Sequence, residues 1–338
     1  MSVRMIAKQA GVSPTTVSLA LHNSPLLPDA TKRRVRACAE KIGYRPNAKL
    51  VALMSQLRVS RIRGAEACFG IVSLYDTPHP WEQSSQWTRL YEAMQKRADE
   101  IGYRLEPIWL RAPGMTYRRA RTIISTRGIQ GLLCFGSPEL EDEFPGEFRP
   151  YAIVTLGQSI RTPLHRVIRH YFSDVWSTLE RVHAMGYRRP GLVLGNYDDV
   201  RSGHACAGAY LGWCEHRLGP AAAVPILRID QVAGSPLLSW LKNHRPDVIV
   251  YVHLPKTLPE LEAFFRANKI RVPNDLGVAA VSQIIEHTRF SGKQENLRLM
   301  GVLAVELLAS RIVNLDFGFP VHPRIEMVES EWIDGRSL

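Results

Sequence analysis

The chain has 338 residues, of which 45% are hydrophobic and 22% charged, enough apolar material for a small domain plus one or two larger cores. No run approaches about 18 consecutive apolar residues and the N-terminal segment lacks an apolar signal core, so we expect no membrane span, no export and a cytoplasmic location. Residues 1–63 contain twelve Lys and Arg against two acidic residues, so they carry +10 of the net charge of +11. This concentration favours nucleic acid as the partner.

The five cysteines are scattered and odd in number, which favours small buried thiols in a reducing compartment over disulfides. Cys206, Cys214 and His216 share one predicted helix, but their spacing fits no standard zinc pattern. We expect them in the core, and we predict neither a metal nor a cofactor.

The segment 3–21 contains two short apolar-periodic stretches on either side of a tight turn. Gly11 supplies the positive φ that the turn needs, Ser13 caps the second helix through its hydroxyl, and Pro14 suits the first helical position. The pattern predicts a helix-turn-helix whose second helix enters the DNA major groove, with an ordinary helical hairpin as the alternative. A third helix is predicted from about Thr31 to near Gly43.

The ordered run GVSPTTVSLALHN, then TKRRV and AEKIGYRPN, resembles the DNA-binding head of the LacI/GalR family of bacterial transcription regulators. The resemblance implies a homodimer that reads a pseudo-palindromic operator in double-stranded DNA. Leu19 stands where relatives often have an arginine, so we expect contact with a thymine methyl there rather than bidentate guanine recognition. The expected DNA-contacting residues are Ser13, Pro14, Thr15, Thr16, Ser18, Leu19, Thr31, Tyr44, Asn47, Leu50 and Leu53.

The segment 46–65 is rather apolar for a linker. In the resembled family it is a hinge helix that becomes ordered on the operator, where one leucine wedges between base pairs of the minor groove. That leucine corresponds to Leu53 here, and such a wedge costs a few kcal/mol of unstacking that the bent DNA offsets. The alternative is that Leu53 only packs a helix pair.

From Cys68 onward the sequence alternates between near-continuous apolar strands and amphipathic helices, which is typical of parallel sheets covered on both faces. We predict an all-α helix-turn-helix head followed by an α/β core of two doubly wound lobes, similar to the periplasmic-binding-protein-like core of the same family. The predicted domains are the head 1–45, the hinge 46–65, a first lobe 66–163 plus about 290–320, and a second lobe 164–289 plus about 321–338. The sequence shows no leucine heptad after the predicted second lobe, so we expect no coiled-coil tail for tetramerisation.

The resemblance also implies a small-molecule effector, a sugar or a related metabolite, between the lobes. Where sugar-responsive relatives have two Asp, an Arg and an Asn, this chain has His170, Ala205, His253 and Ser282. Loss of those bidentate partners of a polyol suggests an effector other than a simple sugar, or an alignment shifted by a residue or two. Further candidates at strand ends, each with a surface or core role as the alternative, are Asp76, Trp81, Asn196, Asp198, Arg201 and Gln283.

No G-x-S-x-G elbow, H-E-x-x-H motif or G-x-x-x-x-G-K-[ST] loop is present, so we do not expect an enzyme. A sugar-processing α/β enzyme is the weaker competitor, since no acid–base pair can be assigned. The stronger competing function is a cytoplasmic solute-binding sensor with a degenerate or non-operator head. The positive charge of the first 63 residues argues against it.

Overall fold

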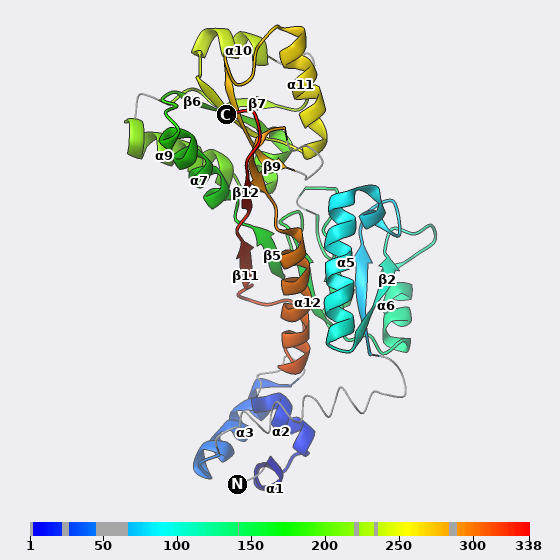
Figure 1. The fold of residues 1–338 in the computed structure, drawn as a ribbon. Helices are drawn as coiled ribbons and strands as arrows, with labels where there is room; N and C mark the ends of the chain where they lie inside the picture. Colours follow the sequence, from blue (N-terminus) through cyan, green and yellow to red (C-terminus); the bar gives the residue numbers. More distant parts are fainter. Residues whose placement is uncertain are drawn as a thin grey trace.

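The computed structural model describes residues 3–21, 27–44, 67–140, 142–219, 223–232, 236–283 and 289–338, apart from the side chains of Arg4, Pro255, Ser282 and Gln283. A helical head is followed by two α/β lobes (Figure 1). The predicted hinge 46–65, with Asn47, Leu50 and Leu53, lies outside the described residues.

Three helices form the head: α1 (Val3–Ala10), α2 (Pro14–Leu21) and α3 (Asp29–Lys41). Each contributes a fully buried side chain to their shared core, namely Ile6, Val17 and Val35. Gly11 has φ +64° between α1 and α2, as the turn prediction required. The third helix begins two residues before the predicted Thr31 and ends two residues before Gly43, and the two helices on either side of Gly11 match the predicted pair.

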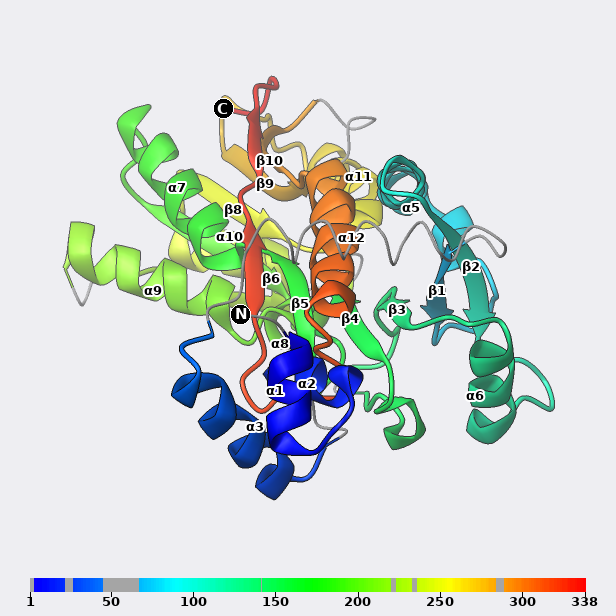
Figure 2. The same ribbon diagram turned by 90° about the horizontal axis from the view of Figure 1, so that it is seen from below.

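The first sheet has six strands in the order β11-β5-β4-β3-β1-β2, all parallel. Helices α5 and α12 pack side by side over one face, and α6 covers the opposite face (Figure 2). Gly301 permits the close approach of α12 to α5, because an added Cβ there would lie 2.7 Å from the carbonyl oxygen of Leu90. The elements are β1 (Ala67–Ser73), α5 (Ser85–Glu100), β2 (Tyr103–Trp109), α6 (Tyr117–Thr126), β3 (Gly131–Cys134), β4 (Ala152–Leu156), β5 (His165–Arg169), α12 (Leu297–Val313) and β11 (Ile325–Val328), with single-turn 3-10 helices η1 (Pro80–Gln83) and η2 (Gly146–Phe148).

The second sheet has the order β12-β10-β9-β8-β6-β7, and only β12 is antiparallel to its neighbour. Helices α7 and α9 cover one face, while α10 and α11 cover the other. The buried Cys206 and Cys214 of α9 lie in the core as expected, but His216, also expected there, is exposed because it lies on the outer face of the helix. The elements are α7 (Tyr171–Ala184), β6 (Pro190–Gly195), α8 (Asn196–Arg201), α9 (Ala205–Leu218), β7 (Leu227–Ile229), α10 (Leu237–His244), β8 (Val248–Val252), η3 (Pro255–Thr257), α11 (Leu258–Ala267), β9 (Gly277–Gln283), β10 (Ser291–Gln294) and β12 (Glu331–Ile333). None of the described helices is long and apolar enough to cross a membrane.

Three strands lie in a different sheet from the one that the predicted lobe boundaries gave them. β5 pairs with β4 and β11 pairs with β5, so both belong to the first sheet, whereas β10 pairs with β9 in the second. The chain therefore passes between the sheets after β5, between β10 and α12, and between β11 and β12. An apolar strand pattern records burial but does not record which sheet edge the strand joins, which is why the boundaries at 164, 290 and 321 were misplaced.

Candidate DNA-binding head and inter-lobe site

The second helix of the head has one buried and one accessible face. Ser13 caps it, because its Oγ accepts a hydrogen bond from the backbone N–H of Thr16 at 3.0 Å, and Pro14 is its first residue. Val17 and Ala20 point into the head core. Thr15 is exposed, and Thr16, Ser18 and Leu19 are partly exposed. Four of the predicted DNA-contacting residues are thus accessible on a helix whose opposite face is held by packing.

The third helix adds exposed positive charge to this module. Arg33, Arg34 and Arg36 are exposed or partly exposed along it, while Lys32 forms an ion pair with Asp29 at 3.2 Å. Thr31 lies in the first turn of the same helix, and the ring of Tyr44 packs against the head core at its far end. Both residues were predicted to contact DNA, and both positions are compatible with contacts to its phosphates.

In the second lobe, three of the predicted effector residues meet where β6 and β8 end. Asp198 Oδ2 lies 2.9 Å from His253 Nδ1, and the imidazole is buried. Asn196 Nδ2 donates to Asp230 Oδ1 at 2.8 Å, and His253 Nε2 lies 3.3 Å from the backbone oxygen of Asp230. We call Asn196, Asp198, Asp230 and His253 the polar cluster. Asp230 was not predicted, although it directly follows a predicted strand and the strand-end rule would have found it.

The remaining predicted effector residues are dispersed. Trp81 is 5% exposed and stacks on Tyr91 with ring centroids 4.3 Å apart, so it is a core residue of the first lobe. Asp76 is exposed, and Ala205 is the first residue of α9. His170 accepts a hydrogen bond on Nδ1 from the N–H of Ser173 at 3.2 Å and so caps α7, in a different network from His253. Ser282 and Gln283 lie on β9, and their side chains are outside the described part.

Arg201 is the predicted effector residue that reaches toward the opposite lobe. It ends α8, and an added Cβ on Gly157, just after β4, would lie 3.6 Å from its Nη2. The neighbouring Tyr171 raises the pKa of Arg201 against the opposing effect of burial, with Tyr197 adding to the rise. Burial in turn raises the pKa of Tyr75, another neighbour of Arg201. The region therefore combines a fixed positive charge with protonated phenols at neutral pH.

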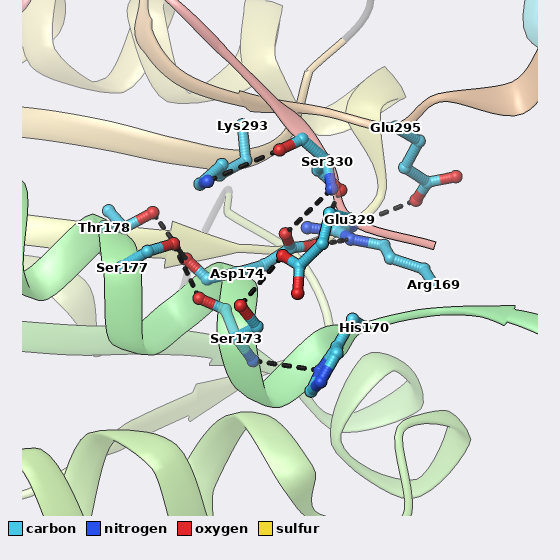
Figure 3. Close-up of polar contacts among 10 residues, drawn as sticks. All are labelled: Arg169, His170, Ser173, Asp174, Ser177, Thr178, Lys293, Glu295, Glu329 and Ser330. Atoms are coloured by element: carbon cyan, nitrogen blue, oxygen red, sulfur yellow. Dashed lines mark hydrogen bonds and ion pairs between the residues drawn. The ribbon is translucent and has the colours of Figure 1, made fainter. Parts of the chain in front are cut away.

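A buried polar network ties together the three passages between the lobes (Figure 3). Arg169, at the end of β5, forms an ion pair with Asp174 of α7 and donates from Nη1 to Glu295 Oε1 at 2.9 Å, just after β10. Asp174 Oδ2 accepts from Ser330 Oγ at 2.7 Å, in the passage from β11 to β12. Burial opposes the charge on Arg169, but Asp174 and Glu295 outweigh it and raise its pKa. We call Arg169, Asp174, Glu295 and Ser330 the hinge network. Within the described ranges no group of three or more His, Cys, Asp or Glu residues is arranged to hold a metal.

Comparison with known proteins identifies a family match over the head. Residues 3–47 match the family described as bacterial regulatory proteins, lacI family. The probable HTH-type transcriptional repressor ExuR of Bacillus subtilis is 44% identical over 55 residues, which is 16% of each chain. The HTH-type transcriptional regulator TreR of Salmonella typhimurium is 24% identical over 236 residues, covering 68% of this chain and 69% of TreR. The match to ExuR spans only about a sixth of the length of that relative.

The whole chain is similar in fold to solved regulators. The complex of transcriptional regulator CelR with cellobiose superposes with a TM-score of 0.60 at 18% identity, covering 100% of both chains. The lac repressor dimer bound to operator and the anti-inducer ONPF superposes with a TM-score of 0.57 at 16% identity, covering 100% of this chain and 98% of that one. A matching head and a matching two-lobed core occur here in the same order. The head therefore belongs to the lacI family of bacterial regulatory proteins, and the chain as a whole shares the fold of these solved regulators.

Proposed function

We propose that this protein is a sequence-specific DNA-binding transcriptional regulator, acting in the cytoplasm, most simply as a repressor. The observation that carries the proposal is the second head helix, capped by Ser13 and held by Val17, with Thr15, Thr16, Ser18 and Leu19 on its accessible face. A helix of this kind can enter the major groove with its first turns against the base edges. The +10 charge of residues 1–63 would supply the phosphate attraction.

We propose further that the protein binds its operator as a dimer. A single short recognition helix reads only a few base pairs, so useful specificity needs a second copy on a symmetric half-site. The lac repressor, which is similar in fold, was solved as a dimer bound to operator, and this supports the same arrangement here. The predicted wedge by Leu53 of the hinge segment belongs to this proposal.

The two lobes would form the sensing part. Asn196, Asp198 and His253 lie at strand ends of the second lobe, where open α/β sheets bind ligands. CelR, which is similar in fold, was solved as a complex with cellobiose, and this supports a small molecule as the effector. Because the polar cluster offers hydrogen-bonding groups and the related curated proteins are regulators, we infer a binding role rather than a catalytic one.

The test is selection of bound DNA from a random pool with the full-length protein. We expect a pseudo-palindrome with a central pyrimidine–purine step, the sequence that bends most readily for an inserted side chain. Thr15→Ala should weaken enrichment, while Thr122→Ala on the surface of α6 makes the same chemical change far along the chain and should leave it unaltered. No enrichment by the unmodified protein would refute the regulator and leave the solute-binding sensor as the better interpretation of the lobes.

A further inference from the structure

A pocket of about 320 Å³ lies between the two lobes. Its first-lobe wall is formed by Gln158 and Arg161, between β4 and β5, by Arg166 near the start of β5, and by Ile325 at the start of β11. Arg201 and Gly203, where α8 turns into α9, form its second-lobe wall. A pocket of this size accommodates a small metabolite. Because both lobes contribute to its lining, a ligand there would contact both at once.

The pocket is positively charged. Three arginines line it, and none of the described residues lining it is acidic. Burial lowers the pKa of Arg166, which reflects the cost of holding a cation away from water. Arg166 is nevertheless kept in place by neutral groups only, because it donates from Nη2 to the carbonyl oxygens of Ile160 at 3.1 Å and Thr162 at 3.2 Å. Its charge is oriented by these bonds without being neutralised by a carboxylate.

Arg201 supplies the facing cation from the second lobe. Among the described residues its guanidinium has neither a hydrogen bond nor an ion pair, although it lies in the partly buried space beside Gly157 and Gln158. Glu295, a carboxylate that raises the pKa of Arg201, is bound to Arg169 of the hinge network. A half-buried guanidinium without an acceptor is costly, and the planar fork of its N–H groups matches the oxygens of a phosphate or carboxylate.

We propose that this pocket, which we call the arginine pocket, binds the oxyanion group of a small-molecule ligand between Arg166 and Arg201. A phosphate or carboxylate there would accept hydrogen bonds from Arg201, neutralise the charge of Arg166, and leave the rest of the ligand to contact Gln158. Binding of the oxyanion follows from the pocket alone. That such a ligand acts as the effector rests on the proposed function, because contact with both lobes would favour the arrangement in which they are close together.

The test uses isothermal titration of the full-length protein, without DNA, at constant ionic strength. Glucose 6-phosphate, gluconate and glucose serve as probes, so that phosphate, carboxylate and neutral ligands of similar size are compared. We expect at least one anionic probe to bind at least about tenfold more tightly than glucose. Arg201→Met should reduce that affinity at least about tenfold. Arg201→Lys keeps the charge but loses the planar fork of N–H groups, so its affinity should lie between those of the unmodified protein and Arg201→Met.

Arg118→Met is the matched control, because Arg118 is exposed on α6 and does not line the pocket. It should bind the anionic probe like the unmodified protein. Arg166→Met tests the opposite wall, but its bonds to the loop make it a less clean variant than Arg201→Met. Equal affinity for glucose and both anionic probes, or anion binding that Arg201→Met leaves unchanged, would overturn the proposal. Neither result would affect the DNA selection, so failure of the arginine pocket and failure of the regulator are distinguishable.

Discussion

Replacing Asp174 with alanine is expected to be among the most destabilising single changes in the lobes. Its side chain is 0% exposed and forms an ion pair with Arg169, which is 2% exposed. The carboxylate also accepts hydrogen bonds from Ser330, at 2.7 Å from Oγ and at 3.3 Å from the backbone N–H. Alanine would leave a buried guanidinium without its main counter-charge. Breaking a buried pair by removing one partner costs about 3–5 kcal/mol.

This cost can be measured as a shift of the thermal midpoint. For domains of roughly 150–250 residues, 1 kcal/mol moves the midpoint by about 2–4 °C, so the expected loss is about 6–20 °C. Differential scanning calorimetry is the suitable assay, because it would also show whether the two lobes separate into distinct transitions once the hinge network is broken.

Two variants make the result specific to the buried pair. Asp334→Ala removes an exposed partner of Arg181, with a side chain 82% exposed, and should shift the midpoint by only a few degrees. The double replacement Arg169→Met with Asp174→Leu removes both charges and should recover much of the loss, since no charge is then left buried alone. A midpoint for Asp174→Ala within about 2 °C of the unmodified protein would refute this account of the hinge network.

Three further predictions concern the head, the polar cluster and pH. Leu19→Arg should change the base preference at one position of each half-site, and DNA selection that returns an unchanged motif would contradict its placement at the groove. Gly195→Ala should weaken effector binding at least about tenfold with little effect on DNA affinity, because the added Cβ would lie 2.5 Å from Asp198 Oδ2; calorimetric titration would decide. The hydrogen bond from His165 lowers the pKa of Asp316 from 3.8 to about 2, so its contribution to stability is present above pH 3.8 and is lost as the pH falls toward 2. Asp316 is half-exposed, so we expect it to contribute about 1 kcal/mol to the free energy of unfolding. Asp316→Asn should reduce the loss of unfolding free energy at acid pH by that amount, as measured by denaturant titration.

The head was predictable because its signals are local. A glycine with φ +64°, a capping serine and a proline at the first helical position act within a few residues, and each appears as expected at Gly11, Ser13 and Pro14. Helix α6 likewise has one buried and one exposed face, as expected of the amphipathic helices that follow Cys68.

The lobes were less predictable where the decisive contacts are distant in sequence. Helix α12 is apolar around much of its circumference, because it lies between α5 and the first sheet, so the periodicity of one apolar face is absent. In the candidate site, strand ends indicated Asn196 and Asp198, and the comparison with sugar-responsive relatives indicated His253. The structure brings these three side chains together. The same rule also selected Trp81, because sequence cannot show that an aromatic side chain after a strand turns back into the core.

The three passages between the lobes also determine the order in which the protein can be completed during synthesis. The first sheet contains β11 and is covered by α12, both of which are made after residue 296. Until then Phe69 and Leu133, which pack in the core beneath α12, lack part of their cover. The head core, by contrast, is composed entirely of residues 3–44. A ribosome-bound chain would therefore carry a foldable head long before its first lobe could close, and the exposed sheet would be the part that needs protection from aggregation.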